Sequence, residues 1–130
     1  MIQIITNEKE IERIYQADVA EREGYIHLDM DDFYEFATKH EAAMAIIVDS
    51  PASVHDQIEI AKAEINKQGI EKVTAVILAI SYKPESPLMM EEMNVGDLFD
   101  DGVNLKRGIL ERDDISNSRS VSLFIFAQRS

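Results

Sequence analysis

Two kinds of hydrophobic spacing alternate along this chain of 130 residues. Apolar residues three or four positions apart predict amphipathic helices, whereas short runs rich in apolar and β-branched residues predict strands. Helical spacing occurs in four segments: 8–22, from Asp29 or Met30 to about Lys39, 53–69 (where Ser53 and Gly69 are the end residues), and 88–99. Strand-like composition marks 42–48, 73–80, 104–112 and 120–127. The predicted order of elements is therefore ααβαβαββ.

The segment 53–69 carries the clearest helix signal. Ser53 is a favourable N-cap residue, and Gly69 lies where helices commonly end in a left-handed glycine. Gly24 ends the first predicted helix in the same way, and the residues after it, YIHL, predict a short extended piece. Gly96 weakens the last helix by about 1 kcal/mol relative to alanine, so this helix is expected to be the weakest.

The order of elements predicts an α+β (mixed α/β) domain. Strands joined through a helix are expected to run parallel, and the last two strands, joined by DDISNS, are expected to form an antiparallel hairpin. This gives a two-layer domain with a mixed four-stranded sheet packed by helices. No repeat or linker divides the chain, so residues 1–130 are interpreted as a single domain.

Charge limits the classes of partner. Acidic side chains outnumber basic ones by 25 to 13, and the formal net charge is −12. Such a surface repels phosphates, so we expect no nucleic acid and no membrane as partner. The lack of cysteine excludes disulfides and thiolate sites. Without a long apolar run or a signal-peptide pattern at its start, the sequence predicts a cytoplasmic protein.

Motifs of nucleotide, metal and nucleophile sites are missing. The five glycines are isolated, and no P-loop, GxGxxG or GxSxG motif occurs, so we expect no nucleotide bound by a glycine-rich loop. His27, His40 and His55 lack zinc-site spacing. His27 with the aspartates at 29, 31 and 32 could hold a hard cation, but the spacing of a calcium loop is lacking. We therefore predict no metal and no cofactor.

Four basic residues lie on the predicted C-terminal hairpin: Lys106, Arg107, Arg112 and Arg119. Arginine binds carboxylates through two parallel hydrogen bonds, so these residues could hold an acidic ligand. Pairing with the surplus surface acids is the commoner behaviour of such charges, and we favour it.

Three aspartates begin the second predicted helix. Asp29 can cap the helix, and Asp31 and Asp32 are favoured at its positive end by about 0.3 to 1 kcal/mol each. Local physical chemistry alone favours this helix-start interpretation.

The same residues also lie in a pattern that resembles a known family. GYIHLDMDDF resembles the segment of FtsZ, the bacterial tubulin homologue, that carries Gly-x-x-Asn-x-Asp-x-x-Asp on its synergy loop. Gly24, Asp29 and Asp32 match the glycine and both aspartates, and His27 replaces the asparagine. Asp31 is not part of the pattern and is interpreted as an ordinary first-turn acid.

The likeness extends over roughly residues 8 to 128. The helix at 8–23 resembles the end of the family's central helix, and EAAMAIIVDSPASVHDQIEIAKAEI resembles its next strand and helix. KVTAVILAI and MEEMNVGDLF resemble the following strand and helix. NLKRGILERDDISNSRSVSLFIFA resembles the closing hairpin, with Asn104, Gly108 and Asp113 in matching places. The resemblance implies the fold of the FtsZ C-terminal domain, which is a mixed four-stranded sheet with helices.

By this resemblance, the chain is a stand-alone FtsZ-like C-terminal domain without the GTP-binding domain. In FtsZ the synergy loop of one subunit enters the nucleotide pocket of the next, where its aspartates position water. The resemblance therefore implies a non-catalytic module that contacts an FtsZ or tubulin-like protein through Gly24, His27, Asp29 and Asp32. Such a module would dock on the nucleotide face of its partner and modulate filament assembly.

Two alternatives stay open. The chain could be an enzyme or small-molecule-binding protein with sites at an oligomer interface, which requires a pocket that gathers residues such as Arg107 and Arg112. It could also be a decayed FtsZ-like domain that acts as a homo-oligomer. His27 favours this last alternative, because imidazole cannot offer the paired donor and acceptor of an asparagine amide.

Overall fold

The computed structural model of this protein describes residues 1–70 and 72–128. These residues form a five-stranded mixed sheet in the order β1-β2-β5-β3-β4. The strands are β1 (Ile2–Ile5), β2 (Glu41–Asp49), β3 (Val73–Tyr82), β4 (Asn104–Glu111) and β5 (Arg119–Ala127). The helical elements are α1 (Glu8–Tyr15), the π-helix η1 (Gln16–Ala20), α2 (Met30–Ala37), α3 (Val54–Lys67), α4 (Met90–Met93) and the 3-10 helix η2 (Gly96–Leu98).

The predicted α+β class is confirmed, with one strand more than the four expected. The single domain interpreted for 1–130 includes residue 71 and residues 129–130, which lie outside the described residues. No helix in the described part of the chain combines the length and the apolar composition that a membrane span requires.

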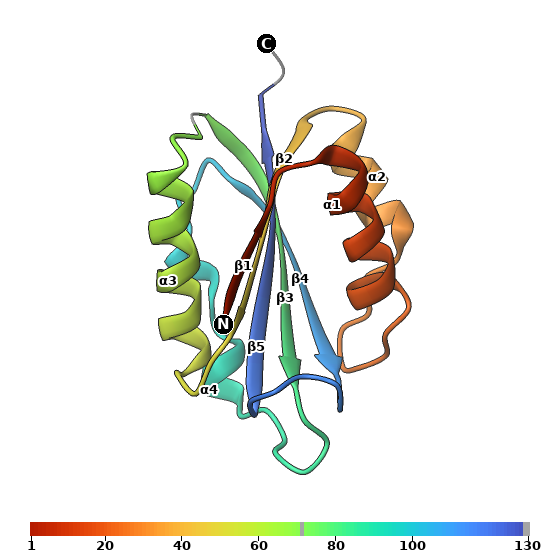
Figure 1. Ribbon diagram of the computed structural model, residues 1–130, viewed down its shortest axis with the longest axis vertical. Coiled ribbons are helices and arrows are strands. Elements are labelled where there is room, and N and C mark those ends of the chain that lie inside the picture. Colours follow the sequence, from red (N-terminus) through yellow and green to blue (C-terminus); the bar gives the residue numbers. More distant parts are fainter. Residues whose placement is uncertain (71, 129–130) are drawn as a thin grey trace.

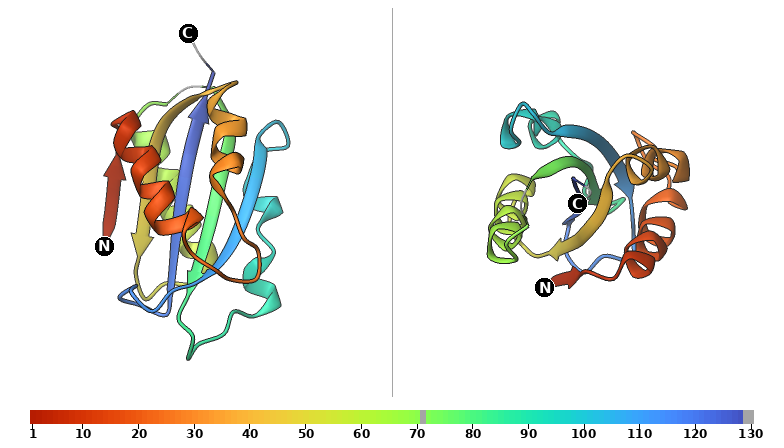
Figure 2. Two further views of the ribbon diagram at one scale, coloured as in Figure 1. Left: turned by 90° about the vertical axis from the view of Figure 1, so that its right-hand side faces the viewer. Right: turned by 90° about the horizontal axis from the view of Figure 1, so that it is seen from above.

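Helices cover both faces of the sheet, so the domain has three layers rather than the two predicted (Figure 1). On the face of α1 and α2, the core includes Tyr15, Phe33 and Phe124. On the face of α3 and α4, it includes Ile58 and Leu78. The central strands bury side chains on both faces, and each apolar face needs a covering layer. Figure 2 shows the two helical layers separated by the twisted sheet.

The predicted C-terminal hairpin is wrong. β5 pairs antiparallel with both β2 and β3, while β4 pairs parallel with β3. β4 and β5 run in opposite directions, but β3 lies between them. The physical reason is burial: nearly every β5 side chain is buried, whereas the first half of β4 is exposed or half-buried. A strand that is apolar on both faces belongs inside a sheet, and one with charged residues suits an edge.

Two other elements differ from the prediction. The edge strand β1 was not predicted, because its four residues are mostly exposed and carry no burial pattern. The helix expected over 88–99 is only the short α4 followed by η2, in agreement with the weakness that Gly96 introduces. In the short extended piece predicted for YIHL, Ile26 forms an isolated antiparallel bridge with Ile109 of β4.

The predicted ends of α3 are confirmed. The Ser53 side chain accepts a hydrogen bond from the Asp56 N–H, and Gly69 follows the C-cap with a φ of +69°. No heavy atom lies within 4 Å of a Cβ built on Gly69, so its backbone angle alone favours glycine there.

We expect Gly69→Ala to lower the free energy of unfolding by about 1 kcal/mol, because alanine is strained at positive φ. Urea unfolding of the purified protein measures this loss. Gly102→Ala is the control, since an added Cβ meets nothing within 4 Å there and the backbone is outside the left-handed region. Equal losses in both variants would contradict the assignment of strain to Gly69.

Candidate functional site

The segment that joins η1 to α2 (Figure 2) contains three of the four residues singled out by the FtsZ resemblance, and the fourth, Asp32, lies in the first turn of α2. It lies against the outer edge of β4. The Ile26 N–H donates to the Ile109 carbonyl at 3.3 Å, and the Ile109 N–H donates back at 2.9 Å. The Glu111 N–H donates to the Glu23 carbonyl at 2.9 Å. The segment therefore has a fixed path over the sheet edge although it is neither helix nor strand.

Two glycines allow this close approach. A Cβ on Gly24 would lie 2.1 Å from the Ile109 carbonyl oxygen and 2.6 Å from Leu110 Cα, which is within the van der Waals limit of both. On the β4 side, a Cβ on Gly108 would lie 2.5 Å from Leu28 Cδ1. Gly24 thus has a packing role that is sufficient to explain it.

Asp29 and Asp32 form a reciprocal cap at the start of α2. The Asp32 N–H donates to Asp29 Oδ1 at 3.2 Å, and the Asp29 N–H donates to Asp32 Oδ2 at 3.0 Å. The predicted capping role of Asp29 is confirmed. Each carboxylate satisfies a backbone donor that the first helical turn would leave unpaired.

Asp32 is also bound from β4. Lys106 Nζ lies 3.0 Å from Asp32 Oδ1 and 2.6 Å from Glu35 Oε2, and it lies 5.0 Å from the centre of the Phe36 ring. Burial alone would raise the pKa of Asp32, but the Asp29 N–H and Lys106 outweigh it and lower that pKa. Burial alone would lower the pKa of Lys106, but Glu35 and Asp32 outweigh it and raise that pKa. The pair therefore stays charged and connects α2 to the sheet.

A buried tyrosine fixes the backbone just before α2. The Tyr15 ring lies 5.0 Å from the Phe33 ring and 5.1 Å from the Phe124 ring, centre to centre, and its hydroxyl donates to the Asp29 carbonyl at 2.9 Å. Burial raises the pKa of this hydroxyl, with smaller contributions from Asp32 and Asp29, so it stays protonated and remains a donor. The position of Asp29 is therefore determined by the hydrophobic core.

The outer side of the segment is open to solvent. Tyr25 is 72% exposed, and His27 and Asp29 are exposed as well. His27 Nδ1 lies 3.1 Å from the Arg22 carbonyl, to which it donates, because a carbonyl oxygen can only accept. Asp32 is half-buried and faces Lys106. The accessible chemistry is thus one tyrosine, one imidazole and the exposed carboxylates.

Tyr25 was missed by the sequence interpretation, although it lies between two residues of the matched pattern. The only available signal was a large aromatic residue directly after a glycine in an irregular segment. Its ring lies 6.4 Å from that of Tyr82, centre to centre, at the end of β3.

The aspartates do not form a metal site. In the described part of the chain, no group of three or more histidine, aspartate or glutamate residues is arranged to hold a metal ion. Asp29 and Asp32 turn towards the backbone at the start of α2 instead of converging on a common point with His27.

The basic residues mostly pair with acids, as favoured from the sequence. Lys106 binds Asp32 and Glu35, Arg112 binds Asp114, and Arg119 binds Glu92. Arg107 differs, because its Nη1 donates to the Met93 carbonyl at 2.6 Å.

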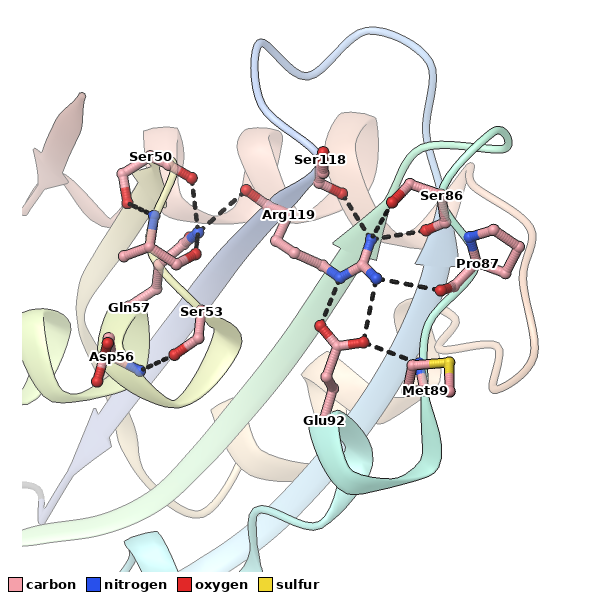
Figure 3. Close-up of polar contacts among 11 residues, drawn as sticks. Ser50, Ser53, Asp56, Gln57, Ser86, Pro87, Met89, Glu92, Ser118 and Arg119 are labelled. Atoms are coloured by element: carbon pink, nitrogen blue, oxygen red, sulfur yellow. Dashed lines mark hydrogen bonds and ion pairs between the residues drawn. The ribbon is translucent and has the colours of Figure 1, made fainter.

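Figure 3 shows the Arg119 guanidinium surrounded by acceptors. Its Nε and Nη2 donate to the Glu92 carboxylate at 2.7 and 3.0 Å, and its remaining donors reach the carbonyls of Ser86, Pro87 and Ser118. The hydrogen bonds with Arg119 lower the pKa of Glu92, which keeps the pair ionised. These hydrogen bonds connect the start of β5 to α4 and to the loop before it, and they occupy the Arg119 guanidinium with acceptors from within the protein.

The neighbouring amide of Gln57 completes this network (Figure 3). Gln57 is fully buried, and the two hydrogens of its Nε2 are shared among the carbonyls of Ser50, Ala52 and Arg119, which lie 2.9 to 3.1 Å from this nitrogen, while its Oε1 has no partner among the described residues of the protein. These bonds hold the turn before α3 against the start of β5. The role of Gln57 is therefore structural.

The arginines required by the small-molecule alternative point to opposite faces of the sheet. Side chains alternate between the two faces along a strand, so Arg107 lies on the same face of β4 as Leu105 and Ile109, which pack on the α3 side. Arg112 instead contacts Asp18 of η1, which lies on the other side of the sheet. Two of the best-formed cavities in the described part of the chain have volumes of about 150 and 160 Å³. Neither of them is lined by Arg107 or Arg112.

Arg112 connects the end of β4 to the candidate segment. It is only 9% exposed, and its Nε and Nη2 donate to the Asp114 carboxylate at 2.9 and 2.8 Å. Arg22, two residues before Gly24, also donates to Asp114 at 2.9 Å. The hydrogen bonds from Arg112 lower the pKa of Asp114 to about 2.

We expect Asp114→Asn to lower the free energy of unfolding by about 1 kcal/mol at pH 7, a value reduced for the partial exposure of Asp114. The pKa of Asp114 is lower in the folded than in the unfolded state, so its stabilisation is complete above about pH 4. It disappears as the pH falls towards 2. Urea unfolding across this range, with the exposed neighbour Asp113→Asn as control, measures the effect. A difference from wild type that persists unchanged at pH 2 would contradict it.

We expect Gly24→Ala to lower the free energy of unfolding by about 1 to 3 kcal/mol, because the new methyl group would overlap the β4 backbone. Urea unfolding measures the loss, with Gly102→Ala as the control. A Gly24→Ala variant as stable as the control would show that the segment does not lie against β4 in solution.

Comparisons with known proteins do not assign this chain to a family. No protein-family model matches it, and a search of curated proteins finds no match. The likeness to FtsZ therefore depends on the residues quoted above and stays a prediction.

Proposed function

We propose that this protein is a non-catalytic interaction module whose contact surface is the Gly24–Asp32 segment, and that it docks on the nucleotide face of an FtsZ or tubulin-like protein. One observation supports this function best: an exposed segment with a fixed backbone. Tyr25, His27 and Asp29 are open to solvent, while the backbone between them is bonded to β4 and to the core. A partner that binds such a segment has little ordering entropy to overcome.

The carboxylates support docking rather than chemistry of their own. Asp29 and Asp32 each accept a backbone N–H, and Asp32 is also paired with Lys106. An aspartate in this state can contact a metal-bound phosphate or a basic residue of a partner, while its hydrogen bonds to the backbone and to Lys106 give it a structural role within this chain. Whatever turnover follows binding then takes place in the partner.

The identity of the partner comes from the resemblance. In FtsZ the matched segment enters the nucleotide pocket of the next subunit. Residues 1–130 carry this segment and no glycine-rich nucleotide-binding motif, so they can occupy such a pocket but cannot themselves offer one to the next subunit. Bound at the end of a filament, it would stop growth there. We therefore expect inhibition of assembly below a one-to-one ratio.

The test is to add the protein to polymerising FtsZ with GTP and to measure pelleted polymer and GTP turnover. We expect both to fall at a ratio below one copy per FtsZ subunit. Asp29→Asn is the informative variant, because asparagine is as good an N-cap as aspartate but carries no charge. It is expected to weaken inhibition by at least about tenfold, the effect of losing one charge-assisted hydrogen bond.

Ser53→Ala is the matched control. It removes a helix cap on the opposite face of the sheet, so it lowers stability by about 1 kcal/mol without touching the Gly24–Asp32 segment. Inhibition by this variant is expected to equal that of wild type. The proposal fails if the protein neither binds GTP-loaded FtsZ nor changes assembly, or if Ser53→Ala loses inhibition as strongly as Asp29→Asn.

A further inference from the structure

The two edges of the sheet are protected very differently. On β4, the Glu23–Ile26 stretch bonds to the outer backbone, and charged Lys106 and Arg107 lie on the strand. On β1, no element lies beyond the strand in Figure 2. Its four residues, IQII, include no charge, no proline and no bulge, so its short length is the one common device against edge-to-edge pairing that the strand itself has.

The register of β1 shows which of its backbone groups are free to pair. Met1 and Asp49 exchange two hydrogen bonds, of 3.0 and 2.9 Å. Bonded and non-bonded positions alternate along an antiparallel pair, so Gln3 also bonds to β2. The backbone N–H and C=O groups of Ile2 and Ile4 therefore point away from the sheet. They form a row of donors and acceptors in which an antiparallel strand can bond.

The side chains on this edge are apolar and exposed. Ile2 is 47% and Ile4 36% exposed, and they lie opposite Val48 and Ile46 on the α3 side of the sheet. Gln3 lies opposite Ile47 and points to the other side. A second strand on this edge would cover both isoleucines.

We propose that β1 pairs with β1 of a second copy of this chain, in antiparallel orientation about a two-fold axis at Gln3. In this register Ile2 of one copy lies opposite Ile4 of the other, and each of these two pairs exchanges two backbone hydrogen bonds. The two Gln3 side chains face one another, and an amide is complementary to itself because it carries both a donor and an acceptor. The two sheets then form one continuous sheet through both copies.

Two copies of this acidic chain repel one another less when they meet at β1 than when they meet at other parts of the surface. Each chain has a net charge of −12, so two copies repel one another over most orientations. β1 itself is uncharged, and pairing there brings together strands with no like charges opposite one another. The remaining repulsion is between more distant, exposed charges, which salt screens. The dimer is therefore expected to become tighter as salt is added.

Sedimentation of the full chain between about 10 µM and about 1 mM tests this pairing, because an interface this small gives a weak dimer. We expect a monomer–dimer equilibrium whose dissociation constant falls severalfold between low and high salt. Ile4→Pro is the informative variant, since the Ile4 N–H points outward and its loss leaves the β1–β2 hydrogen bonds in place. Dimerisation of this variant is expected to weaken by at least about tenfold, the effect of losing two hydrogen bonds.

Ile4→Val is the matched control, because it keeps the outward N–H and most of the apolar surface; it is expected to dimerise like wild type. Urea unfolding midpoints of both variants verify that β1 still pairs with β2. A chain that stays monomeric at about 1 mM in high salt would overturn the proposal. So would an Ile4→Pro variant that dimerises like wild type.

Discussion

β5 occupies the middle of the sheet and has its side chains buried on both faces. A strand of this kind needs a covering layer on each side, since leaving either face open would expose a row of apolar residues to water. The two helical layers follow from this requirement. α1 and α2 cover the face with Phe124 and Phe126, while α3 covers the face with Leu123 and Ile125.

The central position of β5 places β4 at an edge, and this placement creates the candidate site. The outer backbone of β4 needs partners, and the segment between η1 and α2 supplies them through Glu23 and Ile26. Gly24 and Gly108 allow the close approach. A segment that protects a sheet edge is thereby held in one conformation with its other side towards solvent. Protection of an edge and presentation of a binding surface are two consequences of the same contacts.

The sequence predicted the features that depend on neighbouring residues and missed those that depend on distant ones. The four longer strands, the ends of α3 and the Asp29 cap are set by local spacing, and all were found. The position of β5 beside β2 was not predicted, because the order of strands in a sheet depends on how strongly each strand is buried relative to the others. Lys106 lies 74 residues from Asp32, and no local pattern predicts that contact. Tyr25 was not singled out from the sequence, because its exposure to solvent is visible only in the folded structure.

The residues that match the FtsZ pattern have structural roles in this fold, so their presence gives less support to an interaction function. Gly24 is explained by the β4 backbone, and Asp29 and Asp32 are explained by the cap on α2, so a fold without any partner would favour the same three residues. Their agreement with the FtsZ pattern is therefore weaker support than it is in sequence alone. Tyr25 and His27 are different, because exposed aromatic and imidazole groups add little to the stability of a monomer. An interaction at this surface would have to gain its specificity from these two side chains, on a backbone that the capped helix and the sheet edge already hold in place.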